Sequence, residues 1–120
     1  MSSSTRSGRN EAAAIGALRT LTTAQALFRE GDKDQDGVLD YATSLHELGA
    51  ANLIDASLSS GEKRGYRFEV QKGGQLEWSV TADPEVPGET GQRWFFVDES
   101  GVIRFSTLGP AHAEASAIGG

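Results

Sequence analysis

The chain has 120 residues, a length that suits one compact domain with a single hydrophobic core. Apolar residues make up 38% of it and charged residues 23%, as in an ordinary soluble globular protein. The formal net charge of −6 argues against a nucleic-acid-binding protein, because such proteins normally present a basic patch. Cysteine is absent, which excludes disulfides, zinc–thiolate centres and cysteine nucleophiles.

The composition divides the chain into three parts. Residues 1–9 are polar and are expected to form a flexible lead or a cloning remnant. The globular domain is expected over residues 10–108, and the small, polar residues 109–120 predict a flexible tail. The longest run of small apolar residues, 12–18, is interrupted by Gly16 and is far shorter than the roughly 20 residues that span a bilayer.

Residues 10–30 are predicted to form a helix. Asn10 is the expected N-cap, and Gly31 is expected to end the run. Gly16 should cost about 1 kcal/mol relative to alanine in the helix interior. Apolar residues at helical spacing form one stripe, which should face the core: Ala14, Ala17, Leu18, Leu21, Ala24 and Phe28.

Residues 31–65 are expected to be loops and short helices. Ser44 and Glu47 have the spacing of a capping box, which predicts a short helix that stops at Gly49. Asp55 is expected to cap one more turn, which Gly61 would close.

Residues 66–106 alternate between apolar and polar side chains, as half-buried strands do. Strands are predicted over 66–70, 76–80, 93–97 and 102–106, with Leu76, Trp78 and Val80 sharing the core face. The predicted fold class is therefore α+β, with a long N-terminal helix packed on a three- to four-stranded antiparallel sheet and a helical and loop insertion between them.

Adjacent aromatic residues stand at 94–96. Since successive side chains of a strand point to opposite faces, at least one of Trp94, Phe95 and Phe96 must lie away from the helix-covered face. An exposed aromatic contact surface is one interpretation, and ordinary packing against loops is the other.

The clearest chemical pattern is an acidic loop at residues 32–40. Carboxylates at alternate positions before a glycine resemble the start of a calcium loop of the EF-hand or dockerin kind. Thr43 stands where such a loop would close with a bidentate carboxylate, so the pattern is incomplete. The candidate ligands are four aspartates and one backbone carbonyl: Asp32, Asp34, Asp36, Val38 and Asp40.

Two interpretations of this loop remain open. Four carboxylates within nine residues repel one another, and Lys33 offsets only one of them, which favours a bound Ca²⁺ as cofactor. The same residues could also form a solvated turn between two helices.

Nothing in the sequence indicates an enzyme. His46 lies inside the proposed capping box and His112 lies in the tail, and neither belongs to an evident catalytic set. Gly73-Gly74 is expected to be a hairpin turn, because no helix follows to receive a phosphate.

Several ordered segments resemble bacterial type IV pilin-like proteins, including type II secretion pseudopilins. Residues 10–21 and 24–25 are similar to the exposed half of that family's N-terminal helix. Segments 53–55, 60–66 and 81–84 resemble later stretches of it, and 91–98 with 101–104 resemble its closing hairpin. The match spans about residues 10–107.

The resemblance implies the head of a pilus or pseudopilus subunit, located in the periplasm or at the cell surface. Its partners would be copies of itself and other pilin-like subunits, with no nucleic acid, and it would contact a membrane only through a hydrophobic N-terminal half-helix. Nothing before Asn10 matches that half-helix, so the resemblance implies that the assembly segment is missing. The alternative function is a free-standing, secreted, calcium-dependent binding module.

Overall fold

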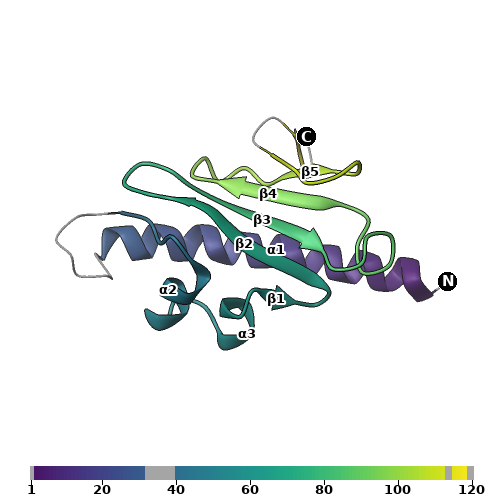
Figure 1. Ribbon diagram of the computed structural model, residues 1–120, viewed down its shortest axis with the longest axis horizontal. Helices are drawn as coiled ribbons and strands as arrows, with labels where there is room; N and C mark the ends of the chain where they lie inside the picture. The colour runs from purple at the N-terminus through teal and green to yellow at the C-terminus, as the bar shows by residue number, and fades with distance from the viewer. Residues whose placement is uncertain (1, 32–39, 113–114, 119–120) are drawn as a thin grey trace.

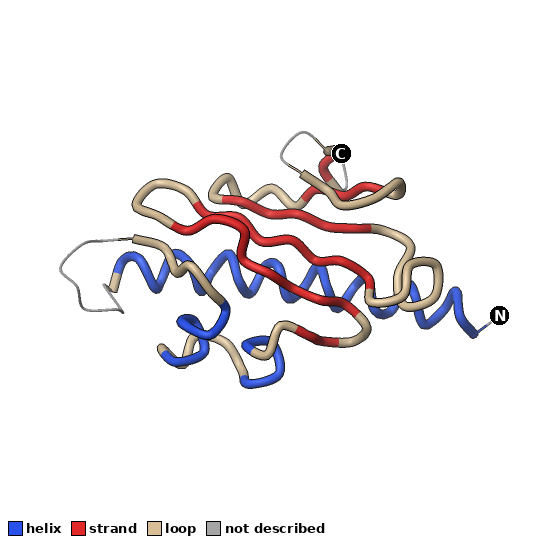
Figure 2. The backbone as a smooth tube through the Cα atoms, in the orientation of Figure 1, coloured by secondary structure: helices blue, strands red, loops and turns tan. Residues whose placement is uncertain are grey.

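The computed structural model describes residues 2–31, 40–112 and 115–118, with the side chains of the first helix described from Gly8 onward. A helix lies across one face of an antiparallel sheet, and two short helices pack beside the sheet's first strands (Figures 1 and 2). The elements in chain order are α1 (Ser2–Glu30), α2 (Leu45–Ala50), α3 (Ala56–Ser59), β1 (Glu62–Lys63), β2 (Tyr66–Gly73), β3 (Trp78–Pro84), β4 (Trp94–Asp98), β5 (Arg104–Ser106) and β6 (Ser116–Ala117).

The predicted fold class is wrong in its balance of helix and sheet. The sheet has six strands, in the order β1-β2-β3-β4-β5-β6, and every neighbouring pair is antiparallel. The protein is thus sheet-rich. One helix, whose side chains are described over residues 8–30, lies on one face of the sheet, whereas the prediction was a long helix on three or four strands.

The strands that the sequence did not predict are the two-residue outer strands. β1 joins β2 through a two-residue turn in which Arg64 (φ 53°) and Gly65 (φ 79°) both adopt positive φ, as the favoured hairpin turns require. β6 comes from the predicted tail and pairs with β5, where Arg104 Nη1 donates to the carbonyl of Ala115 at 2.8 Å. Neither strand is long enough to show alternation in the sequence.

The apolar stripe of α1 forms half of the core, as predicted. Its six predicted residues are all at most 5% exposed, while Leu27, at the edge of the stripe, is 47% exposed. The sheet supplies the other half through its helix-facing side chains: Tyr66, Phe68, Trp78, Val80, Ala82, Phe95 and Val97. Because both sides are apolar and close-packed, this layer holds the fold together.

Two elements begin at residues other than those expected, α1 earlier and β3 later. The prediction that Leu76 shares the core face of its strand is wrong, because β3 begins only at Trp78 and Leu76 lies in the preceding hairpin, 77% exposed. α1 begins at Ser2, before the expected cap at Asn10, whose side-chain amide instead donates to the carbonyl of Thr90 at 2.9 Å.

Both predicted caps of the short helices are confirmed. The backbone N–H of Glu47 donates to Ser44 Oγ at 3.2 Å, and that of Leu58 donates to Asp55 Oδ1 at 2.8 Å. Glu47 Oε1 accepts from the backbone N–H of Thr43 at 2.6 Å, so the return bond of the capping box reaches one residue further upstream. Within the described ranges, no helix is long and apolar enough to cross a membrane.

Candidate functional site

Most of the predicted calcium loop cannot be located. Asp32, Asp34, Asp36 and Val38 lie outside the described residues. Asp40 is described and half-buried, and its Oδ1 atom is buried with no hydrogen-bond partner among the described residues. Across residues 2–31, 40–112 and 115–118, no three His, Cys, Asp or Glu side chains lie close enough to hold a metal ion.

The backbone that follows Asp40 is held firmly against α1. Gln25 is fully buried, and its amide makes two hydrogen bonds to the backbone of Ala42: Nε2 donates to the carbonyl at 3.0 Å, and Oε1 accepts from the N–H at 2.8 Å. The N–H of Tyr41 donates to the carbonyl of Gly74 at 2.7 Å. A polar residue on an apolar helix stripe was the available signal, because Gln25 follows Leu21 by one helical turn.

A second polar connection ties the start of α1 to the loop between β3 and β4. Glu11, 12% exposed at its side chain, accepts from the backbone N–H groups of Gln92 and Arg93 at 2.8 and 3.1 Å. Its other oxygen pairs with Arg93 Nε at 3.0 Å, and that guanidinium lies over the rings of Phe95 and Phe105. No local pattern indicates this connection, because its members are 81 to 82 residues apart in the chain.

Gly91 completes this connection. A Cβ atom there would overlap the hydroxyl end of Tyr66, whose Oη donates to the carbonyl of Arg93 at 2.6 Å. Burial, with the charge of Glu11 adding to it, raises the pKa of Tyr66 far above its usual value, so the phenol stays protonated. These groups anchor the β3–β4 loop to the start of α1.

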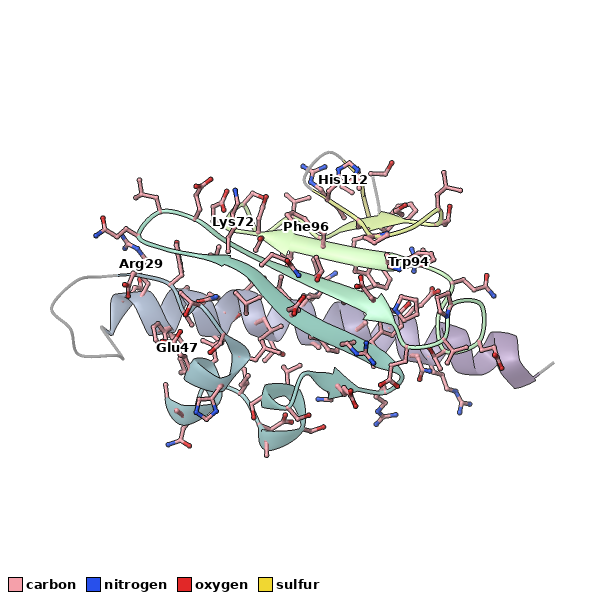
Figure 3. The ribbon with its side chains drawn as sticks, viewed as in Figure 1. Arg29, Glu47, Lys72, Trp94, Phe96 and His112 are labelled. Carbon is pink, nitrogen blue, oxygen red and sulfur yellow. The ribbon has the colours of Figure 1, made fainter. Side chains whose placement is uncertain are left out.

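The sheet face opposite α1 carries side chains of a different kind. Trp94 and Phe96 are half-buried there while Phe95 is fully buried under α1, which confirms that the adjacent aromatics divide between the two faces. Figure 3 labels Lys72, Phe96 and Trp94 along this open face. Phe96 pairs across the strands with Thr81 on one side and Arg104 on the other.

Two charged groups on the open face are incompletely satisfied. Arg104 Nε and Asp83 Oδ1 are buried atoms that have no hydrogen-bond partner within the part of the chain that the structure describes. Burial raises the pKa of Asp83, with the charge of Glu69 adding to the rise and that of Arg67 opposing it. The open face therefore holds polar groups that lack some of their hydrogen bonds to the described residues.

The two histidines lie in different parts of the chain. His46 is exposed on α2, and His112 is exposed near the described end of the chain.

The comparisons with known proteins return no relative. No family model matches the chain, and neither a curated protein nor a solved structure is significantly similar to it. The residues and their placement are therefore the basis on which a function is inferred.

Proposed function

We propose that this chain is the head domain of a filament subunit of the type IV pilin-like kind, a structural protein that is not an enzyme. The observation that carries the proposal is the position of α1. Figure 1 shows its N-terminal turns extending past the sheet, beyond the β3–β4 loop that Asn10 and Glu11 hold. An upstream helical segment would continue along the same axis, away from the domain.

Two further features support this function. The C-terminal two-thirds of α1 is fixed to the sheet by its buried stripe, and the polar bonds of Glu11 and Gln25 lie near the two ends of that stripe. A force applied along the axis of α1 would thus be resisted both by the core and by the hydrogen bonds of Glu11 and Gln25. The proposal rests on this arrangement and on the ordered sequence segments, independently of the strand number.

The first test is the sequence of the gene upstream of the first codon of this chain. An in-frame apolar stretch of about 20 residues behind a short basic leader would support the filament function. A stop codon, or a cleavable secretion signal joined directly to this domain, would contradict it. The alternative, a free-standing secreted calcium-dependent binding module, would then be favoured.

A second test follows the protein into filaments. The chain has no cysteine, so one introduced thiol can be labelled uniquely. Leu108→Cys, at a residue that is 97% exposed, should carry a maleimide dye into filaments sheared from cells that express the gene with its native upstream segment. Leu21→Cys, fully buried, is the matched control and should stay unlabelled in folded subunits. Dye found only on free subunits would contradict the proposal.

We also propose that Ca²⁺ binds the acidic segment and stabilises the head. Support comes from the alternating carboxylates of the sequence and from the lone buried oxygen of Asp40, which would suit a hard cation. Calcium should raise the melting temperature relative to chelator, and Asp34→Ala or Asp36→Ala should abolish the increase. Glu85→Gln, an exposed carboxylate in the β3–β4 loop, should keep it. Identical melting in calcium and chelator would contradict this.

A further inference from the structure

A pocket of about 470 Å³ lies on the open face of the sheet. It is formed by the end of β2, the start of β3 and the end of β4, beside the β2–β3 hairpin. Its volume falls in the range of pockets that hold small ligands or single side chains. The lining residues that carry the argument are Lys72, Glu77, Ser79, Phe96, Asp98 and Glu99.

The floor of the pocket is a polar group without a partner. Ser79 is 5% exposed, and its hydroxyl makes no hydrogen bond to any of the described residues. It stands in one cross-strand row, opposite Lys72 on β2 and Asp98 on β4. The Oγ atom itself is not fully buried, so it is accessible from the pocket and can donate to or accept from a ligand there.

The walls of the pocket carry an excess of negative charge. Three carboxylates, those of Glu77, Asp98 and Glu99, face a single ammonium group, that of Lys72. Glu99 Oε1 accepts a weak bond from the backbone N–H of Trp78 at 3.3 Å, and one oxygen of Asp98 accepts from Ser100. Glu77 and the second oxygen of Asp98 have no hydrogen-bond partner among the described residues.

An aromatic ring completes the site. Phe96 is half-buried and lies two residues before Asp98 on β4, so both side chains stand on the same face as Ser79. A ring beside carboxylates suits a cationic group on a hydrocarbon stem, because the ring packs on the stem and its face attracts the charge.

We propose that this pocket binds the ammonium or guanidinium end of a lysine or arginine side chain from a partner protein. The cation would donate to Glu77, Asp98 and the hydroxyl of Ser79, while its stem lies on Phe96. A protein is the favoured source because the half-buried ring of Trp94 extends the same open face beyond the pocket, which gives a partner's backbone a surface to contact. This inference does not depend on filament assembly.

The binding test uses the ¹⁵N-labelled chain titrated with short capped peptides that differ in one residue. A central lysine or arginine should shift the amide signals of Lys72, Ser79 and Asp98, and the effect should weaken as salt is added. A norleucine peptide, which keeps the stem and loses the charge, should leave these signals in place. Equal shifts with norleucine, or shifts spread over the whole surface, would overturn the proposal.

Variants separate the pocket from general surface charge. Glu77→Gln should weaken binding of the lysine peptide by about threefold to fivefold, as expected for a partly screened ion pair. Glu85→Gln, an equal charge change at the other end of β3, should have no effect. Lys72→Met should strengthen binding, because it removes the pocket's own cation, and a gain cannot come from misfolding. Equal binding by the Glu77→Gln and Glu85→Gln proteins would overturn the site.

A further control distinguishes a protein side chain from a small amine as the source of the cation. Butylamine carries the same charge and stem as a lysine side chain but has no backbone. Tighter binding of the lysine peptide than of butylamine would support a protein partner. Equal affinity would overturn that part of the proposal and assign the pocket to small amines.

Discussion

The two faces of the sheet differ in how completely their side chains are buried and their polar atoms hydrogen-bonded. On the face under α1, Tyr66, Val80 and Phe95 are fully buried, and the phenol of Tyr66 has a hydrogen-bond acceptor. On the open face, Asp83 and Arg104 have buried atoms, and Ser79 a hydroxyl, that form no hydrogen bond to the residues the structure describes. The covered face therefore accounts for the stability of the fold, whereas the open face holds the groups that a partner could satisfy.

The largest expected effect compares two neighbouring phenylalanines on opposite faces. Phe95→Ala would leave a cavity in the core and should lower the free energy of unfolding by about 3–5 kcal/mol. Phe96→Ala removes a half-buried ring from the open face and should cost only about 1 kcal/mol. Urea unfolding followed by circular dichroism measures both. Equal losses would show that the open face is also part of the core.

A smaller effect tests the packing at Gly91. Alanine there would force its Cβ into the ring of Tyr66, so Gly91→Ala should destabilise the protein by about 1–3 kcal/mol. Gly16 in α1 is the matched control, because a Cβ there meets nothing within 4 Å. Gly16→Ala should stabilise the protein by up to about 1 kcal/mol through helix propensity. If both variants melted like the parent, the close approach of Gly91 and Tyr66 would be refuted.

The smallest effect concerns Asp83 on the open face. Its pKa in the folded protein is raised above the unfolded value of about 3.9, so its charged form destabilises the fold above the folded pKa. That penalty disappears as the pH falls below the unfolded pKa. Asp83→Asn should therefore raise the free energy of unfolding at about pH 7 and change it little at about pH 3. A loss of stability at neutral pH would mean that the carboxylate has a stabilising partner.

Local sequence signals predicted the elements whose patterns are long enough to repeat. The α1 stripe, the caps at Ser44 and Asp55 and the division of the aromatic residues at 94–96 followed from spacing and local hydrogen-bonding chemistry. The two-residue strands β1 and β6 could not be predicted, because two residues show no periodicity and their pairing depends on neighbouring strands. This is why the predicted sheet was too small.

The sequence by itself determined which side chains of α1 form the core and where the short helices begin, because those choices depend on residues within one or two turns. Only the tertiary structure decided that Glu11 meets Arg93, that Gln25 meets Ala42 and that Ser79 lies between Lys72 and Asp98. These contacts join residues distant in the chain, and their partners are selected by strand register and helix position. Neither of these can be deduced from local spacing.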